Sequence, residues 1–303
     1  MERKNVYICM LAALLSCSDS VKVSRTLDAM PAIFPDYNGV VIPPNMAPLN
    51  FALDDQDAGS RAVFSFGGQQ FEVKGENGSI VIPPSKWKKL LESAAGDSIQ
   101  VTVQVKQGNE WVAYSPFAIR VAPEKVDSYL AYRLIDPGYE LWNKMGIYQR
   151  DLESYTQIPI IENKMSGNNC VNCHSFCMQD PNKMLFHMRE TFPGTILVDG
   201  DKIEKLNTKT KETISSLVYP SWHPSGKYVA FSVNTTKQAF HLNDRNRVEV
   251  YDEASDVVVY DVEKHEIVTA SNIFSKDAFE TFPTFSPDGK TLYFCTAEAR
   301  PIP

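Results

Sequence analysis

The chain has 303 residues, of which 43% are hydrophobic and 11% aromatic, and its formal net charge at pH 7 is -7. The acidic balance, with no basic run beyond residues 1–4, argues against nucleic acid as a partner. The length allows two domains with a sizeable core. Plentiful aromatic residues and prolines, with little helical periodicity, predict a mainly β chain.

The first 16 residues predict a signal peptide. A short basic start precedes an apolar run at residues 6–15, which is too short for a permanent membrane-spanning helix. The run ends in Leu14-Leu15-Ser16-Cys17, which resembles a bacterial lipobox. This resemblance implies cleavage before Cys17 and lipid attachment to Cys17; an ordinary signal peptide is the alternative. We therefore expect a lipid-anchored protein of the bacterial cell envelope, in the periplasm or at the outer membrane.

Residues 17–38 predict a polar tether that starts at the lipidated cysteine, and residues 39–123 predict a small β-sandwich of immunoglobulin-like architecture. Gly67-Gly68 separates two strand-like runs and predicts a hairpin. Residues 99–106 alternate apolar and polar side chains, which is typical of a half-buried strand.

One helix is expected in this region, at residues 85–95. Ser85 is a candidate for its N-terminal cap. Trp87, Leu90 and Leu91 fall on one helical face and predict a buried stripe.

Residues 124–190 predict an aromatic-rich connector that carries Cys170-Val171-Asn172-Cys173-His174. The pattern Cys-x-x-Cys-His is typical of covalent attachment of a c-type haem. In that chemistry Cys170 and Cys173 each add to one vinyl group of the haem, and His174 supplies one axial nitrogen to the iron. The motif therefore predicts haem c and its iron as the cofactor.

Electron transfer by such a haem needs a second axial ligand on the far face of the ring. Met178 lies four residues after His174, and a helix would place both on the same side of the ring. His187, in a strand-like run, is the preferred candidate, and His241 is the second. A histidine on a strand is also often a hydrogen-bonded structural residue.

Other chemistries fit the same residues. Cys170 and Cys173 are able to form a disulfide in an oxidising compartment. A zinc site is a further alternative, although no second Cys-x-x-Cys or His-x-x-His is present. Its ligands would be drawn from Cys170, Cys173, Cys177 and either His174 or His187.

Residues 191–303 contain an internal repeat. Tyr219-Pro220-Ser221-Trp222-His223-Pro224-Ser225-Gly226-Lys227 matches Phe282-Pro283-Thr284-Phe285-Ser286-Pro287-Asp288-Gly289-Lys290. Proline and glycine close a turn between two antiparallel strands in each copy, and the aromatic residues fill the sheet interface. The repeat resembles that of TolB-like β-propellers, which implies an incomplete propeller here.

A propeller needs at least about four blades to close around its axis. Residues 180–303 supply two or three. We therefore expect either a longer protein or closure by oligomerisation, because an open set of blades exposes sheet edges.

The lipobox, the haem motif and the repeats together resemble Bacteroidetes-type lipoproteins described as TolB-like or cytochrome c family proteins. From residue 129 onward this resemblance covers most of the chain. It implies a propeller joined to a haem-binding segment outside the cytoplasm. As partners we expect the membrane, through the lipid anchor, and a redox or envelope protein. The resemblance implies no reaction.

Three functions follow. The first is an envelope-anchored monohaem c-type cytochrome for electron transfer. Its haem would be held by Cys170, Cys173 and His174, with His187 as the distal ligand. The second is a haem-free propeller lipoprotein that binds a protein or a glycan. The third is an enzyme in which a five-coordinate haem activates peroxide below His187 or Arg189. The absence of a nucleophile elbow, a P-loop and a dinucleotide signature favours an electron carrier or a binding protein over an enzyme.

Overall fold

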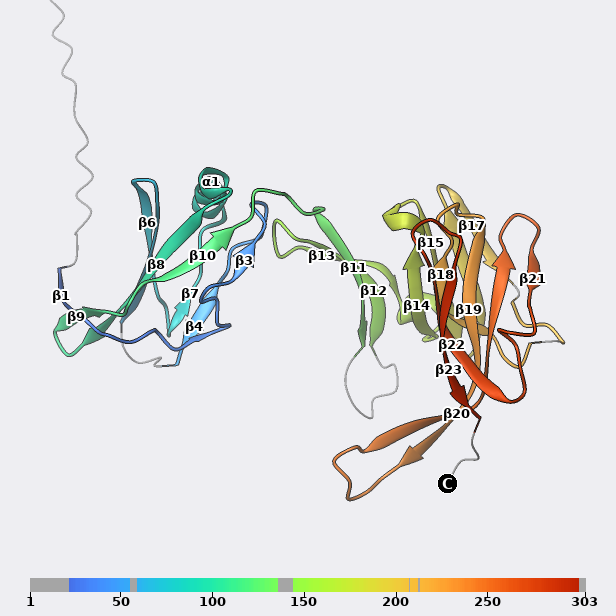
Figure 1. The fold of residues 1–303 in the computed structure, drawn as a ribbon. Coiled ribbons are helices and arrows are strands. Elements are labelled where there is room, and N and C mark those ends of the chain that lie inside the picture. The colour runs from blue at the N-terminus through green and yellow to red at the C-terminus, as the bar shows by residue number, and fades with distance from the viewer. Residues whose placement is uncertain (1–21, 55–58, 136–143, 207, 212, 300–303) are drawn as a thin grey trace, which may run out of the picture. The chain divides into compact units, whose positions relative to one another are not determined.

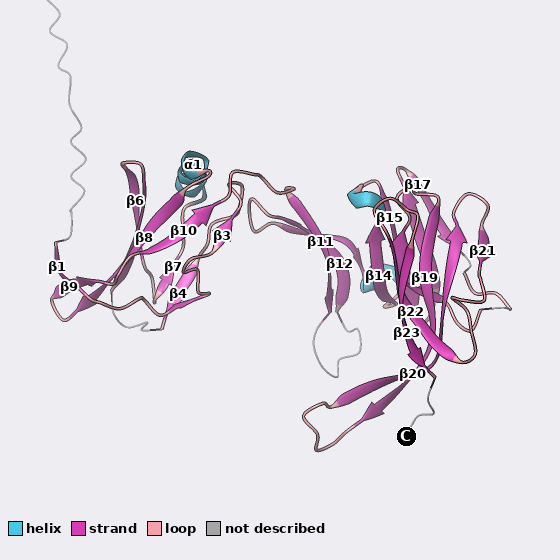
Figure 2. Cartoon of the chain, viewed as in Figure 1, coloured by secondary structure: helices cyan, strands magenta, loops and turns pink. Residues whose placement is uncertain are grey.

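The computed structural model of the chain describes residues 22–54, 59–135, 144–206, 208–211 and 213–299 (Figure 1). Strands dominate this part of the chain, which confirms the mainly β prediction (Figure 2). Contacts divide the chain into two compact units. Unit 1 runs up to Ser128 and includes Asp151–Tyr155, and unit 2 consists of Tyr129–Arg150 and the chain from Thr156 onward. The expected signal peptide and the lipidated Cys17 lie outside the described residues.

The larger sheet of unit 1 has seven strands arranged around β8 (Ser98–Gln107). β8 pairs in antiparallel fashion with three strands, and two short strands add in parallel at the ends of the sheet. The remaining strands are β1 (Val23–Thr26), β3 (Val41–Ile42), β5 (Ser60–Phe66), β6 (Gln69–Lys74), β9 (Glu110–Ala113) and β10 (Phe117–Val121). The hairpin expected at Gly67-Gly68 is confirmed as β5–β6.

The smaller sheet of unit 1 shares one apolar core with the seven-stranded sheet and the helix. Its strands are β2 (Ile33–Phe34), β4 (Phe51–Leu53) and β7 (Ser79–Ile80). Helix α1 (Pro84–Ala94) buries Trp87, Leu90 and Leu91, as the apolar stripe predicted. The prediction that Ser85 caps the helix is wrong, because the helix begins one residue earlier, at Pro84. Proline is tolerated in the first turn of a helix, where its missing N–H would have no helical partner.

Unit 2 begins with a three-stranded sheet and continues with two four-stranded antiparallel sheets whose strands follow chain order. The first sheet holds β11 (Tyr129–Ile135), β12 (Met145–Asp151) and β13 (Gln157–Glu162). The next holds β14 (Cys170–Phe176), β15 (Lys183–Arg189), β16 (Gly194–Asp199) and β17 (Lys202–Leu206). The third holds β18 (Leu217–Trp222), β19 (Tyr228–Phe240), β20 (Val248–Asp261) and β21 (Glu266–Val268), and β22 (Ala278–Phe285) with β23 (Leu292–Glu298) forms a further pair.

The sequence repeat occupies two equivalent hairpins, β18–β19 and β22–β23. In the first, the His223 N–H donates to the Tyr228 carbonyl, and in the second the Ser286 N–H donates to the Thr291 carbonyl. The predicted strand–turn–strand geometry of the repeat is therefore confirmed.

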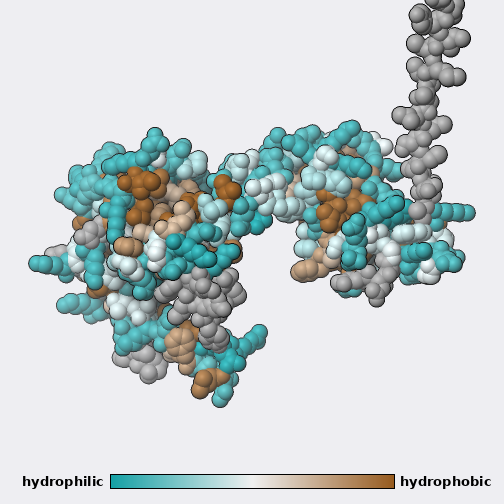
Figure 3. All heavy atoms as spheres, turned by 180° about the vertical axis from the view of Figure 1, so that it is seen from behind, coloured by the Kyte–Doolittle hydropathy of each residue, from teal (hydrophilic) through white to brown (hydrophobic). Residues whose placement is uncertain are grey.

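β19 and β20 continue beyond their sheet as a long two-stranded ribbon (Figure 1). One face carries the ion pairs Lys237–Glu253 and His241–Glu249. The other face carries the exposed side chains of Phe240, Val248 and Val250, and apolar surface is visible at the end of the ribbon in Figure 3. The ribbon is thus amphipathic.

Candidate functional site: the Cys170–His174 strand and two cavities

The motif Cys170–His174 lies on strand β14 rather than on a connector or a helix. β14 pairs in antiparallel fashion with β15, so that Cys170 lies opposite Arg189 and Asn172 lies opposite His187. The expected division of the chain placed residues 124–190 between the domains. Instead, β14 and β15 are the first two strands of a four-stranded sheet, and residues 184–188 of β15 are a continuous buried and mostly apolar run, which is typical of a strand covered on both faces.

A β-bulge interrupts β14 at the second half of the motif. Asn172 pairs with His187 and Ser175 pairs with Leu185, so Cys173 and His174 together face one residue of β15. Cys173 has φ of +50°, and its N–H donates to the side-chain oxygen of Asn172 at 2.8 Å. The backbone at Cys173 is therefore set by the bulge.

The bulge leaves Cys170 and His174 on opposite faces of β14. Val171 and Phe176 pack into an apolar cluster on one face, and the His174 ring meets the Phe176 ring edge-on at 6.2 Å between centroids. Cys170 lies on the other face, because successive strand residues alternate, and it is 4% exposed. A haem bound covalently by both thiols and ligated by His174 needs all three side chains around one macrocycle, so the group does not fit β14 as folded.

The thiols of the motif are free. No disulfide joins the cysteines of the described residues, and in that part of the chain no group of three or more histidine, cysteine or acidic side chains is placed to hold a metal. The zinc site considered from sequence is therefore not assembled. Burial raises the pKa of Cys170, with Cys173 adding to the rise and Arg189 opposing it. Cys177 is buried in a different apolar cluster, and burial also raises its pKa.

His174 is half-buried. Burial lowers its pKa, and a hydrogen bond to the Ala131 backbone opposes that change. Next to it, the Arg133 guanidinium donates to the side-chain oxygen of Asn172. These contacts fasten the motif to strand β11.

His187 is 2% exposed on β15. Its Nδ1 lies 3.3 Å from the Thr195 hydroxyl, and burial, helped by the Arg189 charge, lowers its pKa to about 4. His187 borders a cavity of about 420 Å³ with Arg189, Tyr219 and Val250. It is therefore a neutral, hydrogen-bonded histidine at neutral pH.

The other candidates for a second axial ligand lie elsewhere. His241 is on the ribbon, where its Nε2 is 2.9 Å from Glu249. Met178 is exposed in a short 3-10 helix (Cys177–Gln179) with φ of +48°. The helix that would have aligned Met178 with His174 is not formed, because residues 170–176 are a strand.

The same bulge recurs in the first strands of the next sheets. Val218 and Ser221 of β18 pair with Ser232 and Ala230, and Thr281 and Thr284 of β22 pair with Cys295 and Tyr293. In each strand two residues face one, and the first of the two has positive φ. These residues are Cys173 at +50°, Tyr219 at +50° and Phe282 at +51°.

This equivalence gives the repeat a third copy, which sequence reasoning missed. Cys173-His174-Ser175-Phe176 corresponds to Tyr219-Pro220-Ser221-Trp222 and to Phe282-Pro283-Thr284-Phe285. The sequence signal that the three copies share is a serine or threonine followed by an aromatic residue. Cys173 and His174, the last two residues of the pattern Cys-x-x-Cys-His, occupy the first two positions of this third copy.

Side-chain contacts at these bulges connect β14 to β18 and β18 to β22. The Trp222 indole N–H donates to the Ser175 carbonyl at 3.2 Å, and the rings of Tyr219 and Phe282 lie 4.8 Å apart. Tyr219 and Phe282 are 44% and 54% exposed. Unit 2 therefore presents a pair of aromatic side chains at its repeated bulges.

A second cavity, of about 430 Å³, lies in unit 1. It is bordered by α1, by the proline-rich segment before β4, and by Glu153. Its walls include Met46, Trp87, Leu91, Lys88 and Lys125. The lining thus combines apolar and charged side chains.

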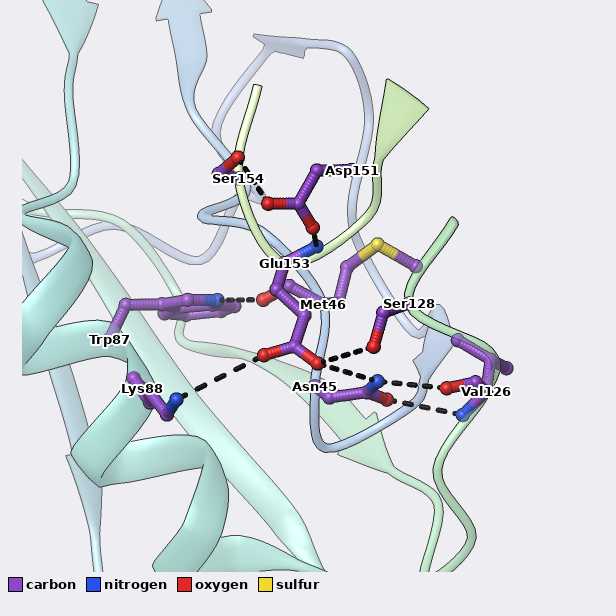
Figure 4. Close-up of polar contacts among 9 residues, drawn as sticks. All are labelled: Asn45, Met46, Trp87, Lys88, Val126, Ser128, Asp151, Glu153 and Ser154. Carbon is purple, nitrogen blue, oxygen red and sulfur yellow. Dashed lines mark hydrogen bonds and ion pairs between the residues drawn. The ribbon is translucent and has the colours of Figure 1, made fainter. Parts of the chain in front are cut away.

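Figure 4 shows how Glu153 is held beside this cavity. Its carboxylate accepts from Asn45 Nδ2 at 3.3 Å and from the Ser128 hydroxyl at 3.0 Å, with Lys88 Nζ at 3.9 Å. These hydrogen bonds, first that of Asn45, lower the pKa of Glu153. Asn45 also exchanges two hydrogen bonds with the Val126 backbone. Asn45 thus links Glu153, at the wall of the cavity, to the Val126 backbone.

Within the described part of the chain, no helix combines the length and the hydropathy that crossing a bilayer requires.

Comparisons with known proteins give weak likenesses. No family model and no curated protein matches the sequence. Dipeptidyl peptidase 4 of Porphyromonas gingivalis shares 14% identity over 57% of this chain and 29% of its own, with a TM-score of 0.35. A DUF4784 family protein of Bacteroides caccae shares 7% identity over 91% of this chain and 83% of its own, with a TM-score of 0.19. The chain spans only 29% of the peptidase.

Proposed function

We propose that this chain is a lipid-anchored binding protein of the bacterial envelope whose unit 2 consists of blades of a TolB-like β-propeller. The observation that carries the proposal is the bulge shared by β14, β18 and β22. The same register irregularity and the same backbone conformation recur at one place in three successive sheets, and such repetition supports a fold built from repeated units. In this proposal Cys173 and His174 belong to the scaffold and bind no haem.

The binding role rests on what the blades expose. Tyr219 and Phe282 are large, rigid side chains that lie beside one another and are each about half exposed. Aromatic side chains of this kind supply much of the contact energy at interfaces with proteins, and they stack on sugar rings. The membrane anchor is proposed from Cys17 and its flanking residues.

A c-type cytochrome for electron transfer is the second candidate, favoured by the pattern Cys-x-x-Cys-His and by the two free thiols. It requires the motif to leave its pairing with β15, because Cys170 and His174 face opposite ways in β14. Cys170, Cys173 and His174 are then the residues that would hold the haem.

A haem-stained denaturing gel with a pyridine haemochrome spectrum separates the two candidates. The full chain is expressed with its signal in a host that matures c-type cytochromes, beside a control cytochrome. We expect no covalent haem. A haem signal that disappears in the Cys170→Ala/Cys173→Ala variant would overturn the first proposal and establish the cytochrome.

The binding role is tested on peptide and glycan arrays with the wild-type protein and with Tyr219→Ala/Phe282→Ala. We expect the wild type to retain a ligand of one class and the double variant to lose it. A third variant, Phe34→Ala, removes an exposed aromatic residue of unit 1 and serves as the control. If all three proteins retain the ligand equally, Tyr219 and Phe282 do not form the binding surface.

A further inference from the structure

Two acidic side chains are buried together in unit 2. Asp256 of β20 is 5% exposed and Glu280 of β22 is 4% exposed. They lie where β22 packs against β20 and β19, and the Ser255 hydroxyl donates to the Glu280 carbonyl at 2.6 Å. Neither side chain takes part in the site described above.

Ser275 holds one oxygen of each carboxyl group. Its hydroxyl donates to Glu280 Oε1 at 2.7 Å, and its backbone N–H donates to the Asp256 carboxyl. Asp256 Oδ1 and Glu280 Oε2 are left buried without a hydrogen-bond partner. Because one serine contacts both groups, the two carboxyls are neighbours, and each keeps one unsatisfied oxygen.

No positive charge balances the pair within the described residues. Three causes act on the pKa of Asp256: burial raises it most, the Glu280 carboxylate raises it further, and the Ser275 N–H opposes them. Around Asp256, β19 contributes Val233 in register, the segment before β22 contributes Ser275, and β22 contributes Glu280. Two ionised carboxylates without a counter-charge are very costly in such a place.

We propose that Asp256 and Glu280 share one proton, and that this proton fastens β22 to β20. One protonated carboxyl satisfies the two unpaired oxygens at once, because an acid donates to a carboxylate. The proposal goes beyond the binding function and is independent of it. It makes the attachment of the β22–β23 pair to the rest of unit 2 sensitive to pH.

The direction of the effect follows from proton linkage. The folded state holds the shared proton at pH values where the unfolded chain, with ordinary carboxyl groups, has released it. Where the folded state binds more protons, stability falls as pH rises. The contribution of the pair is therefore complete at acidic pH and is lost as the pH rises through the pKa of the folded pair.

The test is the pH dependence of the melting temperature of the full chain, measured from about pH 5 to about pH 8. The proteins are the wild type, Asp256→Asn and Glu280→Gln, with Glu266→Gln as the control because Glu266 is exposed on β21. Relative to the two amide variants, we expect the melting temperature of the wild type and of the control to fall by about 2–4 °C or more as the pH rises, because the titration of His187 is common to all four proteins. Both amide variants should lose less, because an amide donates without titrating.

Parallel profiles for all four proteins would overturn the proposal. So would a melting temperature that rises with Ca²⁺ and returns with chelator in the wild type alone, since a cation and not a proton would then hold the pair. If one amide variant fails to fold, the other variant still tests the proposal, because each substitution removes one of the two buried carboxyl groups.

Discussion

Cys173 and Tyr219 occupy the same place in successive strands. Each is the first residue of a two-residue bulge, and each has φ of +50°. Phe282 repeats the arrangement in β22. The second residue of each bulge is His174, Pro220 or Pro283, so proline is native to the position that the haem pattern assigns to an iron ligand.

His174→Pro should therefore be tolerated. Proline inside a strand normally removes a ladder hydrogen bond and is excluded, but two of the three equivalent bulges already contain it. We expect a loss of about 0.5–1.5 kcal/mol, the usual worth of the ring hydrogen bond to Ala131 that disappears. Urea unfolding of unit 2 measures it.

The matched control for this substitution is Met188→Pro. Met188 is buried within β15, which pairs with a strand on each side. We expect Met188→Pro to prevent folding of unit 2. Equal damage from His174→Pro would show that the three bulges are not interchangeable.

His187 should make the protein sensitive to acid. Its pKa is about 4 in the folded chain against an ordinary value of 6.5. As the pH falls through this interval the unfolded chain takes up the proton first, so stability is lost, by about 3 kcal/mol at most. His187→Gln should flatten this part of the stability profile, as measured by urea unfolding at a series of pH values.

The ribbon residue His241, which is half-buried, provides the comparison for His187. His241→Gln should keep the acid sensitivity of the wild type, because it leaves the buried imidazole in place. Loss of the sensitivity in both variants would assign it to another group.

Gly146 has no room for a side chain. A Cβ there would lie 2.6 Å from the Ile161 carbonyl oxygen of the paired strand. Gly146→Ala must push β13 away, and we expect a loss of about 1–3 kcal/mol in the unfolding of unit 2. Gly59→Ala, whose Cβ would meet nothing closer than 3.6 Å, should leave stability nearly unchanged; comparable losses would contradict the steric explanation.

Asn45 should contribute strongly to the stability of unit 1. It makes two hydrogen bonds with the Val126 backbone and one with the Glu153 carboxylate (Figure 4). Asn45→Ala removes all three, and we expect a loss of about 1–3 kcal/mol in the urea unfolding of unit 1. Asn38→Ala, at an exposed asparagine of the same unit, should cost little. Similar values for the two variants would mean that these bonds are replaced by water.

Local patterns in the sequence predicted the elements that depend on neighbouring residues. The Gly67-Gly68 hairpin, the buried stripe around Trp87 and the repeated turns at Gly226 and Gly289 each arise from a few adjacent side chains. Such signals survive because turns, strand alternation and helical periodicity are set over short distances.

What depended on distant partners was not predictable in the same way. The return of Asp151–Tyr155 to unit 1 depends on contacts such as the hydrogen bond from the Ala47 N–H to the Leu152 carbonyl. The pairing of Asp256 with Glu280 joins two strands with no shared pattern. The conformation of Cys173 was obscured by a motif with a strong chemical meaning, although the repeat already contained its structural explanation.

The strand pairings also differ in how far apart along the chain their partners lie. In the ribbon, Phe240 pairs with Val248, whereas in unit 1 Val23 pairs with Trp111. Closing a short loop costs little entropy and takes microseconds, whereas bringing together residues far apart is slow. The β19–β20 hairpin is thus ready to form early in folding, and the parallel pairing of β1 with β9 waits until more than a hundred residues have emerged from the ribosome.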